Sequence, residues 1–350
     1  MPKLLLSFLA CAICALAQKP VFTVGWSVYA GWTPYSYMNK SGLMRKWADK
    51  YGITIKVQRF DYAPSLDAFV ARNIDACTMT NMEALDMPAA SGVPTTAILI
   101  GDYSNGNDAL LVRKGLQLKD LPGKKMLLVE KTVSEYLFDR AMTINGLRQQ
   151  IKQVRMINTS DSDIATAFLS DSSTSAVVSW KPLVSQILTQ KGITSLFNSA
   201  QIPGEILDLT VVRTDVLNRP NGSGRKFAQA LAGAWYEMLA QMTGSGADNI
   251  LAAVAEGSQD TLASYKEQLR TTKMFYTPQS AADFAASPNL KQKMALVRQF
   301  CFDHGLLGAN TKSVDEVAIR YPDGSVQGKP DRVRLHFDLT YMQMAANGKL

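Results

Sequence analysis

The sequence predicts an α/β protein of two lobes that are joined by two crossovers and followed by a helical C-terminal region. Strand-like and helix-like segments alternate from residue 21 to residue 100, which is typical of a parallel sheet with crossover helices. A second alternating set runs from residue 109 to residue 197, and the apolar segment 207–213 is placed to return to the first set. A chain that leaves one lobe, builds another and comes back makes two connections, and such a pair forms a hinge beside an interdomain cleft.

The first lobe is predicted to comprise residues 18–108 and 208–350. Its first strand is expected at 21–25, and a helical pattern at 43–51 ends before Gly52, which serves as the C-cap. Alternating apolar and polar residues predict a strand at 53–60. The segments that follow are expected to be a helix at 65–73, a strand at 74–79, a helix at 81–91 and a strand at 95–100.

The second lobe is predicted to comprise residues 109–207. Its expected strands are 109–112, 125–129, 154–157, 175–179 and 195–197, and its expected helices are 132–144, 161–169 and 182–191. After the return strand, helical patterns at 226–243, 247–256, 261–270, 280–285 and 290–304 predict the C-terminal extension. The tail from residue 313 is polar and is expected to be irregular apart from 338–347.

The N-terminus has the features of a secretory signal peptide. Lys3 precedes an apolar run at 4–17, and Ala15-Leu16-Ala17 forms a small-x-small cleavage site. The run is too short to be a permanent membrane-spanning helix, so we expect residues 1–17 to be removed and the mature protein to be exported. A lipoprotein signal that uses Cys11 or Cys14 is the alternative.

Composition and motifs argue against several function classes. The net charge is +7, but the Lys and Arg residues are dispersed without a basic run, so nucleic acid is not an expected partner. Neither His304 nor His336 has metal-ligand neighbours, and the sequence contains no G-x-S-x-G, H-E-x-x-H, P-loop or G-x-G-x-x-G signature. We therefore expect a binding protein without catalytic residues, metal or cofactor. Cys77 and Cys301 are expected to be buried free thiols.

The segment 24–35 is the most distinctive part of the sequence. It holds two Trp, two Tyr, two Gly and one Pro directly after the first predicted strand. Gly and Pro permit a tight loop, and loops at the carboxyl ends of strands are where open α/β sheets bind ligands. We expect Trp32 to be the principal ligand contact of this loop and Trp26 to be packed beneath it, the alternative being that all of these rings are ordinary core.

The order of several motifs resembles the periplasmic solute-binding proteins of the nitrate, sulfonate and taurine group of ABC transporters. Besides the signal peptide and the Gly-rich loop, the matching segments are Arg72-Asn73-Ile74-Asp75-Ala76, Leu121-Pro122-Gly123-Lys124, Ser134-Glu135-Tyr136-Leu137 and Ala176-Val177-Val178-Ser179-Trp180-Lys181-Pro182. The resemblance covers residues 21–270. It implies a two-lobed, type II-like periplasmic-binding-protein fold, a periplasmic location, and a monomer that delivers a small-molecule ligand to an ABC permease in the inner membrane.

A narrower resemblance is carried by residues 25–34, residues 79–85 and the long C-terminal tail. These features look like the binding proteins associated with urea carboxylase-type operons, a setting that is linked to guanidine uptake and breakdown. This resemblance implies a small nitrogenous ligand.

The chain departs from the wider group at Glu135, where sulfonate-type relatives often carry a His or a neutral polar residue. A carboxylate at a helix N-terminus suits the helix dipole, but it repels an anionic ligand bound at the same end. Six other acids fall at predicted strand ends or crossovers: Asp61, Glu83, Asp102, Asp108, Glu205 and Asp208. We expect two or three of these six to line the cleft.

We expect the ligand to be held by aromatic, polar and acidic side chains from both lobes: Trp26, Tyr29, Trp32, Thr80, Asn81, Glu83, Asp102, Glu135, Trp180, Glu205 and Asp208. Several have a structural alternative. Trp180 could pack under the second-lobe loop, Thr80 and Asn81 could only cap a helix, Glu135 could be a helix-start charge, and Asp208 could be a hinge residue.

Aromatic faces beside carboxylates favour a flat cation, and guanidinium is the leading hypothesis. It would stack between Trp32 and Trp180 and donate paired N–H groups to a carboxylate. Urea would leave a buried carboxylate unpaired and ranks below guanidinium, with taurine or another sulfonate, nitrate and larger guanidino compounds as further alternatives. An enzyme related to the thiamin-pyrimidine synthesis proteins, which resemble this group in fold, is a hypothesis of a different class. The signal peptide and the lack of a Cys cluster argue against it, and a receptor that only signals is a third possibility.

Overall fold

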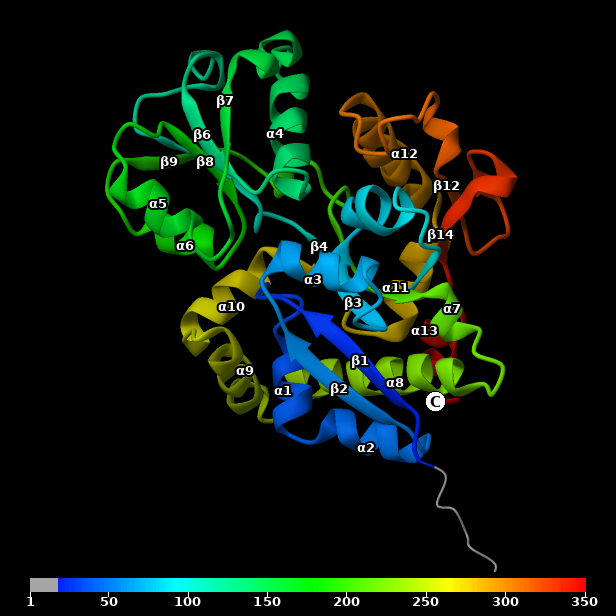
Figure 1. Ribbon diagram of the computed structural model, residues 1–350. Coiled ribbons are helices and arrows are strands. Elements are labelled where there is room, and N and C mark those ends of the chain that lie inside the picture. Colours follow the sequence, from blue (N-terminus) through cyan, green and yellow to red (C-terminus); the bar gives the residue numbers. More distant parts are fainter. Residues whose placement is uncertain (1–17) are drawn as a thin grey trace, which may run out of the picture.

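Two β-sheets, one in each lobe, organise the protein (Figure 1). The computed structural model describes residues 18–350, and the predicted signal peptide, 1–17, lies outside the described residues. The chain leaves the first sheet after β4 (Thr95–Ser104), builds the second sheet, and returns along β10 (Leu207–Arg213). These two connections confirm the predicted two-lobed α/β fold with two crossovers.

Lobe 1 contains a nine-stranded sheet with the order β13-β12-β14-β4-β10-β3-β1-β2, and β11 pairs with β4. Its other strands are β1 (Val21–Trp26), β2 (Thr54–Arg59), β3 (Ala76–Thr80), β11 (Thr272–Met274), β12 (Ala318–Arg320), β13 (Val326–Gln327) and β14 (Val333–Phe337). β1 is parallel to β2 and β3, whereas β10 runs antiparallel between β3 and β4. The sheet is therefore mixed rather than parallel throughout, because the return from lobe 2 sends β10 back in the opposite direction.

Helices from distant parts of the chain cover the lobe 1 sheet. They are α1 (Pro34–Lys40), α2 (Leu43–Lys50), α3 (Tyr62–Val70), α7 (Thr214–Leu217), α8 (Ser223–Thr243), α9 (Ala247–Ala255), α10 (Leu262–Arg270), α11 (Pro278–Ala286), α12 (Pro288–Asp303) and α13 (Thr340–Ala346). The long helix α8 packs against α2 beneath β1 and β2 (Figure 1). Its Phe227 ring stacks on Phe22 of β1 with centroids 4.5 Å apart, and its Trp235 ring lies 5.7 Å from Tyr35. These ring contacts hold β1 in place, and β1 leads into the segment 24–35, which we call the aromatic loop.

Lobe 2 contains a five-stranded sheet with the order β7-β6-β8-β5-β9. The strands are β5 (Ala109–Arg113), β6 (Lys125–Leu128), β7 (Arg155–Asn158), β8 (Ala176–Ser179) and β9 (Ile193–Asn198), and the helices are α4 (Val133–Ile144), α5 (Ile164–Ser170) and α6 (Leu183–Leu188). Alternate residues of β5 face opposite sides of the sheet, as the two-residue period of a strand requires. Leu110 belongs to the large core that includes α4, while Leu111 belongs to a smaller core with α5 and α6.

The C-terminal extension reaches across to lobe 2. Helix α12 stands beside α4 (Figure 1), and the rings of Phe300 and Tyr136 meet edge to face with centroids 5.2 Å apart. Arg148 and Asp303 form an ion pair at 2.6 Å between the same two parts. The extension therefore supports both lobes.

Two predicted elements differ from the structure. Residues 313–337, expected to be irregular, contain β12, β13 and β14, and β14 pairs parallel with β4. β12 and β13 have only three and two residues, which is too short for an alternating pattern, whereas β14 does alternate apolar and polar residues over its five positions and could have been predicted. The helix expected at 81–91 is a π-helix at Leu85–Ala89, and it contains Pro88, which lacks the N–H that a regular α-helix needs.

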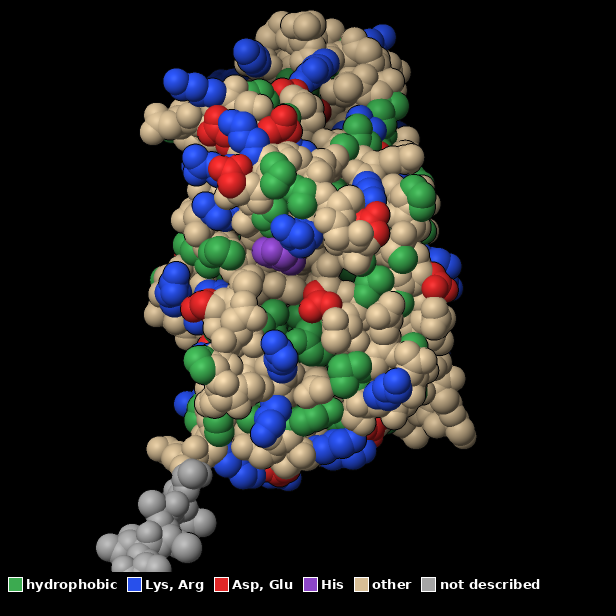
Figure 2. Space-filling model, turned by 90° about the vertical axis from the view of Figure 1, so that its right-hand side faces the viewer, with side chains coloured by type: hydrophobic (Ala, Val, Ile, Leu, Met, Phe, Trp, Pro, Cys, Tyr) green, Lys and Arg blue, Asp and Glu red, His purple; other side chains and the backbone are tan. Residues whose placement is uncertain are grey.

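The surface and the cysteines agree with the composition. The face shown in Figure 2 spreads its Lys and Arg side chains among polar and apolar ones rather than in one patch. Cys77 and Cys301 are buried free thiols, which confirms the prediction for both. Among residues 18–350, no helix has the length and apolar character needed to cross a membrane.

Candidate ligand-binding site between the lobes

A small cavity lies where the two lobes meet, and we call it the inner cavity. Its lining comes from lobe 1, from lobe 2 and from both crossovers: Tyr29, Trp32, Tyr62, Thr80, Asp108, Val133, Trp180, Ile206 and Asp208. The enclosed space is small, about 10 Å³, which is close to the room needed by one water molecule. A ligand of a few heavy atoms would therefore require the side chains that line the inner cavity to move apart slightly.

Four aromatic rings form a continuous row along the inner cavity. The centroid of Trp32 lies 5.1 Å from that of Tyr29 and 5.4 Å from that of Tyr62, and Tyr62 lies 5.7 Å from Trp180. Trp180 follows β8 of lobe 2, whereas the other three belong to lobe 1. The row thus spans the cleft, and its rings offer faces and edges to a ligand from both sides.

The tight loop after β1 brings its backbone against a buried acid. The Thr33 hydroxyl and the Trp32 N–H both donate to the carbonyl of Tyr29, which folds the loop into a turn. A Cβ atom on Gly31 would lie 2.1 Å from Oδ2 of Asp102, so only glycine allows this approach. Gly31 is therefore needed in this loop because any larger residue would collide with Asp102.

Strand register brings the acids together. Because β10 lies between β3 and β4, Asp208 is the cross-strand partner of both Asp102 and Thr80. The hydroxyl of Tyr29 donates to Oδ1 of Asp102 at 3.1 Å. Within residues 18–350, Oδ2 of Asp102 and Oδ2 of Asp208 are buried and have no hydrogen-bond partner. Of the two, only Asp208 lines the inner cavity, while Oδ2 of Asp102 lies against Gly31. A proton shared between the two carboxyl groups, or a bound cation, would satisfy these oxygens.

Burial raises the pKa values of three neighbouring carboxyl groups. The pKa of Asp102 rises to about 7, although hydrogen bonds from Asp208 and Tyr29 oppose the effect, and that of Asp108 also rises to about 7, opposed by Ser104. The pKa of Asp208 lies well above its usual range because of burial and the nearby charge of Asp102. In the described part of the chain no Lys, Arg or His forms an ion pair with any of the three. Such a group of acids is stabilised by protons or by a bound cation.

Glu83 lies just behind the cavity wall and links the lobes. It is fully buried, its Oε2 accepts a hydrogen bond from Thr80 Oγ1, and its Oε1 accepts one from the backbone N–H of Val133 at 2.7 Å. Burial raises the pKa of Glu83, while hydrogen bonds from Thr80, Val133 and Tyr62 lower it. This carboxylate belongs to lobe 1, whereas Val133 is the first residue of α4 in lobe 2.

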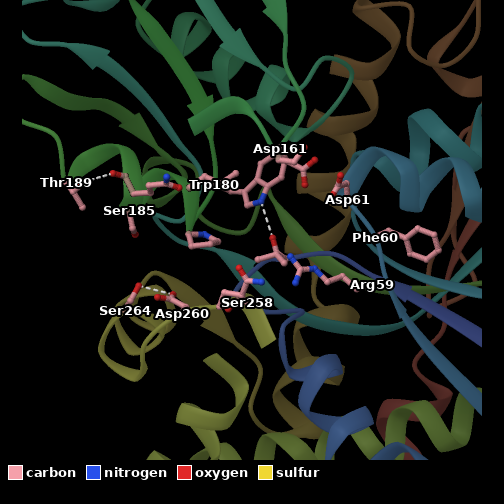
Figure 3. Close-up of a pocket in the computed structure, with 16 residues that line it drawn as sticks. Arg59, Phe60, Asp61, Asp161, Trp180, Ser185, Thr189, Ser258, Asp260 and Ser264 are labelled. Carbon is pink, nitrogen blue, oxygen red and sulfur yellow. Dashed lines mark hydrogen bonds between the residues drawn. The ribbon is translucent and has the colours of Figure 1, made fainter. Parts of the chain in front are cut away.

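Trp180 separates the inner cavity from a larger hollow at the cleft mouth, which we call the outer pocket. The indole Nε1 donates to the backbone carbonyl of Val28 at 3.4 Å, from lobe 2 to lobe 1 (Figure 3). The outer pocket has a volume of about 610 Å³, and Asp61, Asp161 and Asp260 are among its lining residues. Trp180 lines both spaces, so its ring is the partition between them.

The structure brings six of the predicted site residues to the inner cavity or into direct contact with its lining. Tyr29, Trp32, Thr80, Trp180 and Asp208 line it, and Asp102 contacts Tyr29 and Asp208. Glu83 is one layer behind, hydrogen-bonded to Thr80.

The structure places the remaining four elsewhere. Trp26 is buried within β1, and the side chain of Asn81 joins the carbonyl of Glu205 to the N–H of Leu207. Glu135 accepts from the N–H of Lys131 at 2.9 Å, as a helix-start carboxylate does. Glu205 pairs with Arg140 at 2.7 Å and also accepts from Tyr136. Asn81, Glu135 and Glu205 thus have partners within the protein in this arrangement of the lobes.

Sequence reasoning did not select Tyr62, Val133 or Ile206, and it named Asp108 only as a candidate acid. Tyr62 lies just after the end of β2, as the aromatic loop lies after β1. An aromatic residue in this position could have indicated a ligand contact. Val133 and Ile206 contribute ordinary apolar side chains, for which the sequence held no signal.

Comparisons with known proteins bear on the fold. No protein-family model and no curated protein sequence matches the chain. The alkanesulfonate-binding protein SsuA from Xanthomonas axonopodis pv. citri, bound to MOPS, is similar in structure with a TM-score of 0.67 and 15% identity, covering 83% of this chain and 96% of that one. The periplasmic aliphatic sulphonate binding protein SsuA from Escherichia coli has a TM-score of 0.63 and 18% identity, covering 82% and 94%.

A nitrate-binding protein is similar over nearly the whole chain. The periplasmic nitrate-binding protein NrtA from Synechocystis PCC 6803 has a TM-score of 0.57 and 11% identity, covering 95% of this chain and 99% of that one. All three of these neighbours are named as binding proteins. The chain therefore has the periplasmic-binding-protein fold.

Proposed function

We propose that this protein is the solute-binding component of an ABC importer, and that it captures a small nitrogenous cation, guanidinium before others, in the inner cavity. The observation that carries the proposal is the group of three buried carboxyl groups that have no cationic partner among residues 18–350, set beside a row of four aromatic rings. An exported receptor of this kind would release its ligand to a permease in the inner membrane.

The chemistry of the inner cavity matches a planar cation. The carboxyl groups of Asp208 and Asp108 line the cavity and can accept N–H groups of guanidinium, a charged hydrogen bond that is stronger than a neutral one. The faces of Trp32 and Trp180 can contact the flat cation, with each such contact contributing about 0.5–2 kcal/mol when it is desolvated. Bound guanidinium would also remove the repulsion among the acids.

An anionic ligand is disfavoured by the same residues. Sulfonate or nitrate would bring a further negative charge beside Asp102, Asp108 and Asp208, with no Lys or Arg in the lining of the inner cavity to compensate it. Burying unpaired like charges costs several kcal/mol. The structural neighbours named for sulfonate and nitrate therefore share the fold of this chain, while its cavity favours the opposite charge.

Urea is the second candidate, and one atom favours it. Nε1 of Trp32 is a buried donor without a partner among the described residues, and a carbonyl oxygen would satisfy it. Guanidinium has no acceptor to offer this N–H. Urea, in turn, leaves the carboxyl groups either protonated or unpaired.

Lobe closure would trap the ligand. Lobe 2 contributes Trp180 and Val133 to the lining, so a rotation that separates the lobes opens the inner cavity to solvent. The permease would then distinguish the closed, loaded receptor from the open one.

The test is isothermal titration calorimetry of the purified mature protein with guanidinium, urea, methylammonium, taurine and nitrate at constant ionic strength. We expect guanidinium to bind most tightly and the two anions not to bind. Tight taurine binding without a response to guanidinium would refute the cation site. A pyridoxal-type absorbance in the purified protein would point instead to the enzyme class.

A further inference from the structure

The first turn of α4 in lobe 2 points its backbone N–H groups toward lobe 1. This helix has twelve residues and begins at Val133, after the N-cap Thr132. The N-terminus of a helix carries a partial positive charge and N–H groups without intrahelical partners, and it readily binds anions. Because Val133 lines the inner cavity, this helix end lies at its wall.

Glu83 of lobe 1 fills that helix end. Its Oε1 accepts the Val133 N–H at 2.7 Å, and its Oε2 is held by Thr80. The side chain is fully buried, so water does not share the interaction. We infer that Glu83 is a built-in anion that occupies the α4 N-terminus in place of an anionic ligand and thereby excludes anions from the site.

A second polar group at the same helix end supports this inference. Ser134 is only 1% exposed, and its hydroxyl has no hydrogen-bond partner within residues 18–350. Together with the Val133 N–H it forms a pair of donors that suits an anion with more than one oxygen. Glu83 uses one of these donors, and the second remains beside it.

The surroundings explain why an anion cannot add to Glu83. Asp86 lies near enough for the charges of Glu83 and Glu135 to raise its pKa, and Asp108 senses the charge of Glu83 as well. Lys131 gives a smaller opposing effect on Asp86. An incoming anion would thus meet several carboxyl groups instead of a free helix end. This inference explains how the site would select cations, and it rests on the proposed function.

The experiment compares three variants of the mature protein by calorimetry with methanesulfonate and with guanidinium. The titrations are made at pH 5.5, where Asp102 and Asp108 are largely protonated and do not themselves repel an anion. Glu83→Ala empties the helix end, and we expect it to gain methanesulfonate binding by about tenfold or more over the wild type. Glu83→Gln keeps a side chain of the same shape against Val133 and should gain none. Glu135→Gln is the matched control, because it removes one carboxylate from the same helix turn but leaves Glu83 in place.

The outcomes separate this inference from the proposed function. Methanesulfonate binding by the wild type, or no gain in a folded Glu83→Ala protein, would overturn the role of Glu83. An equal gain in Glu135→Gln would show a general charge effect and would overturn it too. If the wild type fails to bind guanidinium while Glu83→Ala gains methanesulfonate, the role of Glu83 stands and the proposed ligand falls. Circular dichroism and thermal melts establish that each variant is folded. A gain of methanesulfonate binding in Glu83→Gln, which keeps the helix end filled, would overturn the inference even if Glu83→Ala does not fold.

Discussion

Asp102 and Asp208 lie side by side on the antiparallel strands β4 and β10, and each keeps one buried carboxylate oxygen without a hydrogen-bond partner in the described structure. Two acids in this position destabilise the unliganded protein, since burial opposes their charge and each opposes the ionisation of the other. A fold that retains such a pair does so at a cost in stability, which is a property of binding sites more than of cores. Substitutions in this pair should therefore change ligand affinity and the stability of the fold in opposite directions.

Replacing Asp208 with Asn should weaken ligand binding and strengthen the fold. We expect Asp208→Asn to lower guanidinium affinity about 10- to 100-fold, because a charged hydrogen bond worth about 1.5–3 kcal/mol is lost. The same change removes a buried like charge and should raise the melting temperature of the unliganded protein. Calorimetry and thermal melts measure both effects.

Asp61→Asn serves as the control for this experiment, since Asp61 lines the outer pocket and is exposed. It should leave both affinity and melting temperature nearly unchanged. Lower stability in Asp208→Asn, with unaltered guanidinium binding, would contradict a role for Asp208 in cation binding.

Guanidinium binding should strengthen as the pH rises through 7. Asp102 and Asp108 have pKa values of about 7, so at pH 6 both are largely protonated and must release protons before they can pair with a cation. Each such proton changes the affinity by up to about tenfold per pH unit. Calorimetry from pH 5.5 to pH 8 in buffers of different ionisation enthalpy gives the affinity and the number of protons released. Urea, being neutral, should bind without this gain, so a flat profile for guanidinium would argue against direct pairing.

The same pKa values predict how the unliganded protein responds to pH. Asp102 and Asp108 have ordinary values of 3.8 and native values of about 7, so between these limits the native state binds more protons than the unfolded chain. These two groups therefore make the free energy of unfolding fall as the pH rises through that window. Denaturation of the wild type and of Asp102→Asn at pH 5 and pH 7.5 isolates the contribution, which should be smaller in the variant.

Sequence reasoning identified the two-lobed fold and several residues of the inner cavity, for physical reasons that differ. Alternation of strands and helices over long segments is a strong signal, and it predicted the excursion into lobe 2 and the return along β10. Trp32 stood out because aromatic rings, glycine and proline follow the end of β1. The strands β12 and β13 carry too few residues to show a period and were not predictable in this way. β14 does alternate apolar and polar residues over its five positions, so the sequence held a signal for it.

The sequence alone could not show which of the acids face the inner cavity. Asp102, Asp208 and Glu205 all follow or flank predicted strands and are alike in the sequence. Cross-strand register turns Asp102 and Asp208 toward each other, whereas Glu205 is neutralised by Arg140, 65 positions away in the chain. Pairings of this range depend on how α4 packs against the crossover, and no local pattern contains that information.

Trp180 should control how fast the ligand leaves. Trp180→Phe keeps a ring against Tyr62 but removes the N–H that donates to the Val28 carbonyl, and a hydrogen bond of this kind contributes about 0.5–1.5 kcal/mol. We expect the dissociation rate of guanidinium to rise severalfold in Trp180→Phe and further in Trp180→Ala, with the association rate nearly constant. Stopped-flow fluorescence measures both rates.

Trp47→Phe is the matched control for the loss of an indole donor. Trp47 donates to Glu237 at 2.7 Å, away from the inner cavity, so its replacement should leave the dissociation rate unchanged. Equal effects of the two Phe variants would mean that Trp180 does not act as the partition between the cavity and the outer pocket.

Glu205→Gln should affect stability rather than selectivity. The Glu205 side chain is 4% exposed and is paired with Arg140 at 2.7 Å and Lys293 at 3.5 Å, so its neutralisation leaves two cations without their partner. Breaking a buried ion pair from one side costs about 3 kcal/mol, and we expect a clear fall in the melting temperature. Glu237→Gln removes an ion pair at the surface, with Lys46, and should cost at most about 1 kcal/mol. Guanidinium affinity should stay close to that of the wild type in both variants, because neither side chain lines the inner cavity. A stable Glu205→Gln protein that no longer binds guanidinium would instead make Glu205 a ligand contact in a more open arrangement of the lobes.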